Sequence, residues 1–127
     1  VISLLKKYSY TLAILWALVI FGLCSMPGKL IPTISWLELL SFDKWVHAGV
    51  FFVLVCLFVV AVSAHQQNKN LIYVYFLLAV LYGGALEVMQ ATVFSDRSAD
   101  WLDMIANSFG CLMALLLKNK TAGLVFK

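Results

Sequence analysis

Charged residues are scarce in this sequence: they make up 12% of its 127 residues, while 64% of the residues are apolar. A soluble domain carries about a quarter charged residues, so this composition argues against a soluble fold. The apolar residues stand in long runs and do not alternate with polar ones, as they would in membrane-spanning β-strands. The sequence therefore predicts an all-α, polytopic integral membrane protein, built as a single domain over residues 1–127.

Several functional motifs are missing as well. The three cysteines form no CxxC pair and are interpreted as small buried apolar side chains. A net charge of +3 is too small to indicate nucleic-acid binding. There is no HExxH motif, and no serine or cysteine has a base partner at motif spacing. Internal repeats, which are common in transporters, are also missing, and this argues against transport.

Four apolar segments predict membrane-spanning helices, at about residues 8–26, 43–64, 71–91 and 100–117. Although the first one resembles a signal peptide, we expect it to be retained, because further apolar spans follow it. Residues 27–42 are too interrupted by Pro27, Gly28 and Pro32 to cross a membrane. They predict either a short interfacial helix anchored by Trp36 or a plain loop. Short connections favour an antiparallel four-helix bundle.

The distribution of basic residues predicts how the bundle is oriented. Six lysines fall on the side that holds both ends of the chain and the turn at 65–70: Lys6, Lys7, Lys69, Lys118, Lys120 and Lys127. Three basic residues fall on the other side: Lys29, Lys44 and Arg97. Cytoplasmic segments are enriched in Lys and Arg, so we expect both termini to be cytoplasmic.

Polar residues gather at the opposite, outward end of the predicted bundle. Helix positions three, four and seven apart share a face, and two such stripes occur. They consist of Gly83, Glu87 and Gln90 on the third span and Asp100, Asp103, Asn107 and Gly110 on the fourth. Asp43, Lys44 and His47 begin the second span. These segments predict one polar pocket that opens outward.

Three motifs stand in order along the chain: Asp43-Lys44-x-x-His47, then Glu87-x-x-Gln90, then Arg97-Ser98-x-Asp100-x-x-Asp103-x-x-Ala106-Asn107-x-x-Gly110. With these motifs the chain resembles the VanZ-like family of small bacterial membrane proteins. The resemblance implies a four-helix protein of the bacterial cytoplasmic membrane. The best-known member of that family is associated with low-level resistance to the glycopeptide teicoplanin. Ala114 stands where members often carry a second glycine.

The first functional hypothesis is a binding site for a cell-envelope component, namely a lipid headgroup, a lipid-linked wall precursor or a glycopeptide. Lys44 and Arg97 would face a phosphate or carboxylate, because both side chains carry a fixed positive charge. The remaining candidate ligand-binding residues are polar and lie in the same three segments: Asp43, Gln90, Ser98, Asp100 and Asn107. Membrane lipids are the expected partners.

The second hypothesis is a membrane hydrolase, with His47, Glu87 and Asp103 as the candidate catalytic residues. His47 and a buried carboxylate could act as a general acid–base pair. The same side chains could instead bind a divalent metal that activates water. Because the metalloprotease spacing is missing, we assign no metal and no cofactor from the sequence.

The third hypothesis is structural. Polar side chains at helix starts would then be caps, and Asp103 would form an ion pair with Lys44 or His47. Asn107 and Gln90 would form interhelical hydrogen bonds. Four glycines would permit close helix packing, within one chain or in an oligomer: Gly49, Gly83, Gly84 and Gly110.

Overall fold

The computed structural model describes residues 2–25, 42–92 and 101–125 of the chain. Within these ranges the regular structure is all helical and contains no strand, which confirms the all-α part of the prediction. The helices are α1 (Ile2–Lys7), α2 (Ser9–Ser25), α4 (Phe42–His65), α5 (Leu71–Thr92), α6 (Trp101–Leu116) and α7 (Lys118–Val125).

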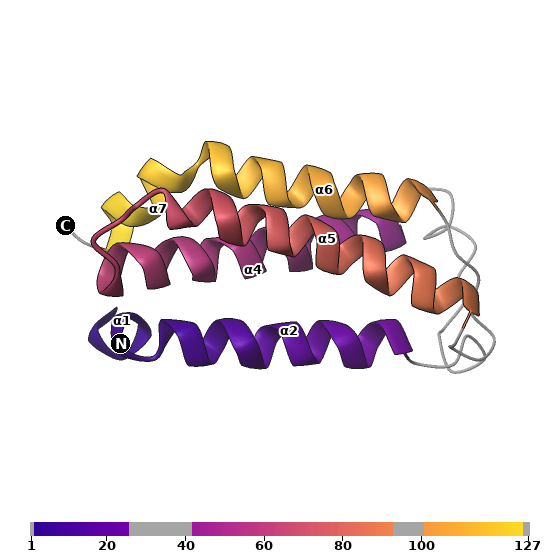
Figure 1. The fold of residues 1–127 in the computed structure, drawn as a ribbon, viewed down its shortest axis with the longest axis horizontal. Helices are drawn as coiled ribbons and strands as arrows, with labels where there is room; N and C mark the ends of the chain where they lie inside the picture. The colour runs from indigo at the N-terminus through magenta and orange to yellow at the C-terminus, as the bar shows by residue number, and fades with distance from the viewer. Residues whose placement is uncertain (1, 26–41, 93–100, 126–127) are drawn as a thin grey trace.

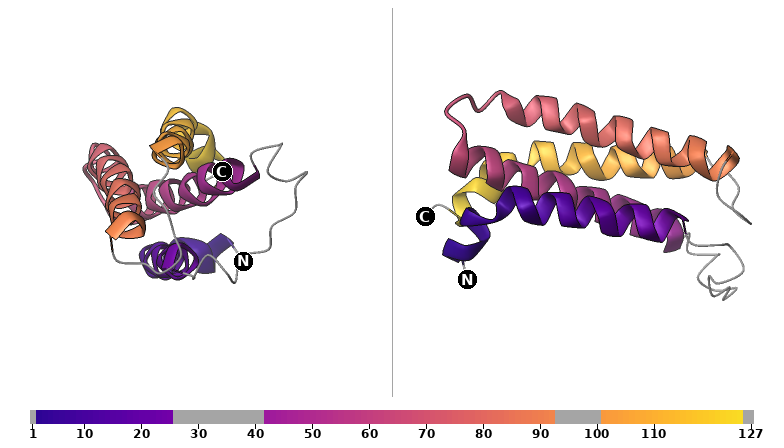
Figure 2. Two further views of the ribbon diagram at one scale, coloured as in Figure 1. Left: turned by 90° about the vertical axis from the view of Figure 1, so that its right-hand side faces the viewer. Right: turned by 60° about the horizontal axis from the view of Figure 1, so that its bottom comes forward.

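Four long helices, α2, α4, α5 and α6, lie side by side and alternate in direction (Figure 1). Helix α4 is central, because it contacts α2, α5, α6 and α7. The end-on view in Figure 2 places α2 and α6 on opposite sides of α4, with α5 beside it. The two ends of the described chain lie at the same end of this bundle (Figure 1).

Each predicted span coincides with one long helix to within a residue at either end. The apolar runs and the breakers between them explain this agreement, because both mark where a helix can continue. Helix α7 was not predicted, since its sequence begins with the polar residues Lys118, Asn119 and Lys120. The predicted interfacial helix and its anchor Trp36 lie outside the described residues.

Two of the long helices are long and apolar enough to cross a membrane: Trp45–His65, with a mean hydropathy of 2.6, and Leu71–Met89, with 1.9. Among the described residues, Ser9–Leu23 and Leu102–Leu116 are apolar but shorter. The fold buries only 39% of the first candidate span and 28% of the second. Much of their apolar surface therefore faces outward, including Leu77 and Leu81 on α5.

The buried core joins all four long helices. Its fully buried side chains come from each of them, among them Ile20, Phe51, Leu54, Leu86 and Cys111. Hydrogen bonds between helices are added at the edges of this core. The indole N–H of Trp16 donates to the carbonyl of Val50 at 2.8 Å, and the hydroxyl of Tyr82 donates to the carbonyl of Ala17 at 2.5 Å. Helix α2 is thereby tied to both α4 and α5.

The end of the bundle that carries the N-terminal helix is rich in lysine. Lys69 donates to the carbonyls of Ser63 and Gln66 at 3.1 and 2.6 Å, which satisfies groups that the end of α4 leaves open. Nε2 of His65 lies 2.8 Å from the carbonyl oxygen of Lys6 and so links α4 to α1. Lys118 and Lys120 on α7 also belong to this end.

Candidate functional site

Four polar side chains from three helices meet near the other end of the bundle. His47 stands about one and a half turns into α4, and Glu87 lies at a similar depth from the end of α5. Asp103 and Asn107 stand four residues apart on α6, so they share one face. That face is turned toward α4, while Leu102, Ile105 and Phe109 on the other face of α6 are exposed.

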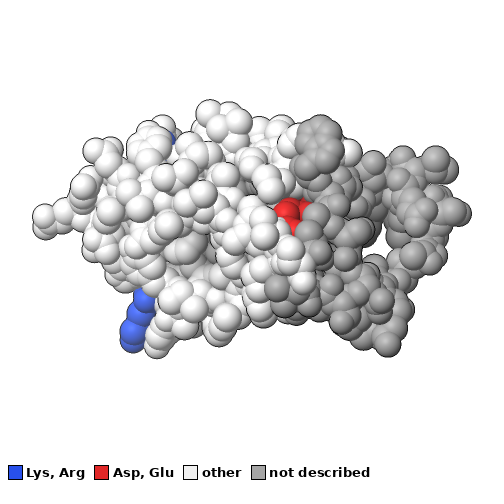
Figure 3. Space-filling model, turned by 45° about the vertical axis from the view of Figure 1, so that its right-hand side comes forward, with Lys and Arg blue, Asp and Glu red and all other residues white. Residues whose placement is uncertain are grey.

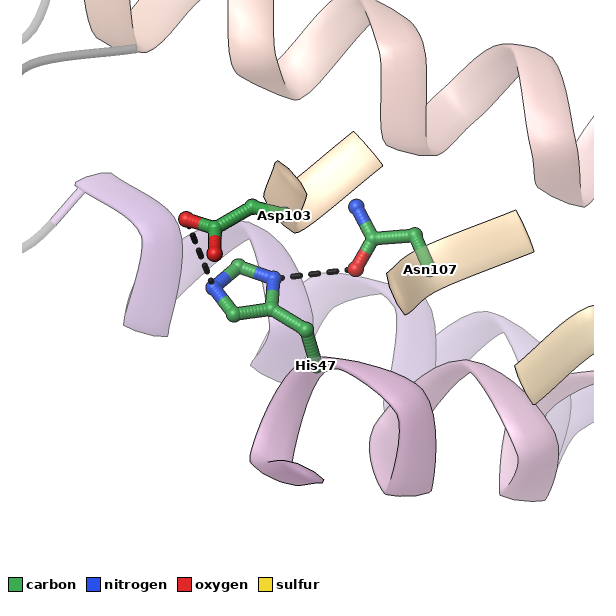
Figure 4. A network of polar contacts seen from close by, with 3 residues as sticks. All are labelled: His47, Asp103 and Asn107. Atoms are coloured by element: carbon green, nitrogen blue, oxygen red, sulfur yellow. Dashed lines mark hydrogen bonds and ion pairs between the residues drawn. The ribbon is translucent and has the colours of Figure 1, made fainter. Parts of the chain in front are cut away.

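His47 lies between the two polar side chains of α6, as Figure 4 shows. The two atoms Nδ1 of His47 and Oδ1 of Asn107 are 2.9 Å apart, a hydrogen-bond distance. On the other side of the ring, Nε2 lies 3.6 Å from Oδ2 of Asp103. An amide oxygen only accepts hydrogen bonds, so Nδ1 of His47 carries a proton and donates it to Asn107.

Glu87 completes the cluster from α5. One ligand atom each from His47, Glu87 and Asp103 can be chosen so that all three lie within 4.8 Å of one another. Glu87 is 3% exposed and Asp103 is 8% exposed, so both carboxyl groups are shielded from bulk water. Glu87 and Asp103 are the acidic residues whose side chains the structure describes, and acidic residues form the small red patch in Figure 3.

Two glycines make room for this cluster. A Cβ atom added to Gly83 would lie 3.0 Å from Nδ2 of Asn107, so the side chain of Asn107 fills the space that the glycine leaves. A Cβ atom added to Gly110 would overlap the backbone carbonyl of Ala48. Gly110 is thus a point of close approach between α6 and α4, three residues beyond Asn107. Each of these glycines belongs to one of the two polar stripes recognised in the sequence, and each allows its stripe to approach a neighbouring helix closely.

The remaining predicted site residues belong to two groups. Asp43 and Lys44 lie in the first turn of α4 and Gln90 lies in the last turns of α5, but their side chains are outside the described part. Arg97, Ser98 and Asp100 lie outside the described residues altogether. The structure thus brings together His47, Glu87, Asp103 and Asn107.

Two of the glycines expected to permit close packing do not do so. A Cβ atom at Gly49 would meet nothing within 4 Å, because this position faces outward from α4. At Gly84 the nearest atom would be the methyl group of Met104 at 3.9 Å, an ordinary contact. The direct hydrogen bond between His47 and Asn107 was not predicted either. Both residues were recognised as polar residues within apolar segments. They lie 60 residues apart on different helices, so the sequence did not indicate that they contact each other.

The cluster can take part in two kinds of chemistry. An imidazole beside a carboxylate can bind and release protons, and two carboxylates with an imidazole can coordinate a cation. A shallow depression of about 380 Å³ lies elsewhere, on the outer face of α6, and is lined by Met104, Ile105, Ser108, Phe109 and Leu112. It contains no charged side chain, so the cluster remains the candidate site.

Comparison of the chain with protein-family models, with curated proteins and with solved structures found no match.

Proposed function

We propose that this chain is a four-span integral membrane protein that binds or modifies a cell-envelope component at the end of the bundle where His47 and Glu87 lie. The expected ligand is a lipid headgroup or a lipid-linked wall precursor. The outward-facing apolar surface of α4 and α5 supports the membrane location, since a soluble protein rarely exposes so much contiguous apolar surface. The antiparallel arrangement with α2 and α6 supports four spans.

One observation carries the functional part of the proposal: three helices bring buried polar groups to one place in an otherwise apolar bundle. A charged residue at the centre of a membrane helix costs roughly 2.5–3.5 kcal/mol on insertion scales. Glu87, Asp103 and Asn107 are all at least nine-tenths buried. Polar residues within membrane segments generally mark binding or transfer sites, and here they converge from α5 and α6 on His47 of α4.

The cluster suits particular parts of a headgroup. Carboxylate oxygens accept hydrogen bonds from ammonium and hydroxyl groups, which phospholipids and sugar-linked precursors both carry. Lys44 and Arg97 remain the predicted partners of a phosphate. The resemblance to the VanZ-like family supports an envelope ligand and extends the proposal to teicoplanin susceptibility, with both termini in the cytoplasm of a bacterium.

Native mass spectrometry of the gently extracted protein tests the proposal. We expect the wild type to retain a discrete lipid or precursor that Glu87→Gln loses, because the substitution removes a charge while keeping the shape of the side chain. Ser108→Ala is the matched control, since Ser108 lies on α6 and its hydroxyl donates to the carbonyl of Met104 within the same helix. This control should retain the ligand.

Thermal melting in detergent separates function from structure. A functional cluster predicts that Glu87→Gln melts at nearly the wild-type temperature while the ligand is lost. If all three proteins carry only bulk lipid and Glu87→Gln melts well below the wild type, the cluster serves to join the helices and the ligand-site proposal is wrong.

The contact between His47 and Asp103 favours a second candidate, an acid–base membrane hydrolase. Asn107 fixes the orientation of the imidazole, as a second group does in many general-base pairs. Incubation of the protein with extracted envelope lipids, followed by mass analysis of the products, tests this activity. A hydrolase predicts products with the wild type and none with Asp103→Asn; the absence of any product with wild-type protein would leave binding as the function.

A further inference from the structure

The geometry points to a divalent metal site formed by His47, Glu87 and Asp103, with Asn107 holding the imidazole in place. These residues supply one nitrogen and two carboxylate groups from three different helices. Such a donor set binds borderline ions of the Zn²⁺ and Mn²⁺ class, whereas Mg²⁺ and Ca²⁺ prefer oxygen ligands throughout.

The distances between the ligand atoms fit an ion among them. Ligand atoms bound to Zn²⁺ at about 2.1 Å in a tetrahedral shell are about 3.4 Å from one another. Nε2 of His47 and Oδ2 of Asp103 are 3.6 Å apart, close to this spacing. Ligand atoms of all three residues lie within 4.8 Å, so an inward movement of about 1 Å would close the set around an ion. The 3.6 Å separation is that of an ion pair, and a divalent cation that displaces the proton from Nε2 would bridge the same two groups.

The proton on His47 stands on the correct nitrogen for metal binding. Because Nδ1 donates to Oδ1 of Asn107, a neutral imidazole has its lone pair on Nε2, the nitrogen that faces Asp103. A cation between Nε2 and the carboxylate would accept this lone pair. Histidines that bind metals usually donate their other N–H to an oxygen acceptor, and Asn107 provides one.

This inference does not depend on the proposed envelope ligand. Three protein ligands leave at least one coordination position open, and a headgroup oxygen or a water molecule could take it. The metal site would exist in either case, and the experiment below contains no envelope ligand.

The test is a calorimetric titration with Zn²⁺ of the whole chain, solubilised in detergent and freed of metal by EDTA and its removal. We expect about one ion bound per chain and weaker binding of Mn²⁺, in line with the usual order of affinities. His47→Ala and Asp103→Asn should weaken Zn²⁺ binding at least tenfold, and Asn107→Ala about 10–100-fold, as the loss of an outer-shell partner does in known sites.

His65→Ala is the matched control, because the chain has two histidines and His65 lies at the lysine-rich end. It should bind Zn²⁺ like the wild type. A titration with Co²⁺ tests whether the cysteines bind the metal instead. Thiolate ligands give bound Co²⁺ a strong charge-transfer band in the near ultraviolet, and we expect this band to be absent.

Melting curves cover the case in which a variant folds poorly. Zn²⁺ should raise the melting temperature of the wild type and of His65→Ala but not that of Asp103→Asn. If the wild type binds no Zn²⁺, or if His47→Ala binds it as tightly as His65→Ala does, the metal site is wrong. The envelope-ligand proposal would be unaffected by that result.

Discussion

Gly110 on α6 lies directly against the backbone carbonyl of Ala48 on α4, leaving no room for a side chain. Ala48 follows His47, and Gly110 lies about one turn beyond Asn107, so the same approach brings these two polar residues within 2.9 Å of each other. Helix packing and the polar cluster are therefore coupled: a change in the separation of α4 and α6 changes the site.

Gly110→Ala should destabilise the protein and disrupt the cluster together. The added Cβ would meet backbone atoms of Ala48, which cannot rotate away, and overpacking of this kind costs about 1–3 kcal/mol or more. Gly49→Ala is the control, because a Cβ there meets nothing within 4 Å. Melting in detergent measures both. Equal melting temperatures for the two variants would show that the close approach is not required.

Gly83→Ala should act on the cluster more selectively. A Cβ at Gly83 would lie 3.1 Å from Cβ of Asn107 and 3.0 Å from its Nδ2, so the amide must shift away from its place beside His47. We expect the ¹⁵N resonances of the imidazole to lose the pattern of a protonated Nδ1. The neighbouring Gly84→Ala should leave these resonances unchanged, since its nearest contact would be at 3.9 Å. If Gly83→Ala also leaves them unchanged, Asn107 does not depend on the glycine.

Tyr82→Phe should weaken the attachment of α2 and spare the cluster. Its hydroxyl donates to the carbonyl of Ala17, and the loss of one such hydrogen bond costs about 1 kcal/mol. Melting should occur at a lower temperature, while Zn²⁺ binding should stay at the wild-type level. Tyr73→Phe on the same helix is the control, because Tyr73 is 49% exposed and the substitution keeps the ring that faces Lys118. Loss of Zn²⁺ binding in Tyr82→Phe would mean that α2 also shapes the site.

The proposed orientation can be checked by cysteine labelling in a background without the native cysteines. Asn68→Cys, in the turn between α4 and α5, should react only with reagent supplied from the cytoplasm. Ser95→Cys should react from outside intact cells. Labelling of Ser95→Cys from the cytoplasm alone would reverse the topology and remove the basis for an outward-facing envelope site.

Much of the fold could be predicted because the sequence of each apolar helix is itself enough to indicate where the helix begins and ends. Apolar runs and the breakers between them marked the long helices. The spacing of Asp103 and Asn107 placed both on one face of α6, and the spacing of Gly83 and Glu87 placed both on one face of α5. The pairing of His47 with Asn107 could not be predicted, because it depends on how closely and at what rotation α4 meets α6. Gly110 sets that distance through Ala48, and periodicity within one helix carries no information about a neighbouring helix. The same limitation made Gly49 and Gly110 look equivalent in sequence although only Gly110 is enclosed.

The position of Glu87 and Asp103 near one end of the bundle has an electrical consequence. In the proposed orientation, a cation reaching His47 from outside would cross about 7 Å of a hydrocarbon layer about 30 Å thick, roughly a quarter of it. A full crossing is worth about 2.3 kcal/mol per charge at 100 mV, so a divalent ion would gain about 1 kcal/mol, or roughly fivefold in occupancy. The voltage of an energised cell would then favour cation binding, and the affinity of the site would fall roughly fivefold as the voltage collapsed.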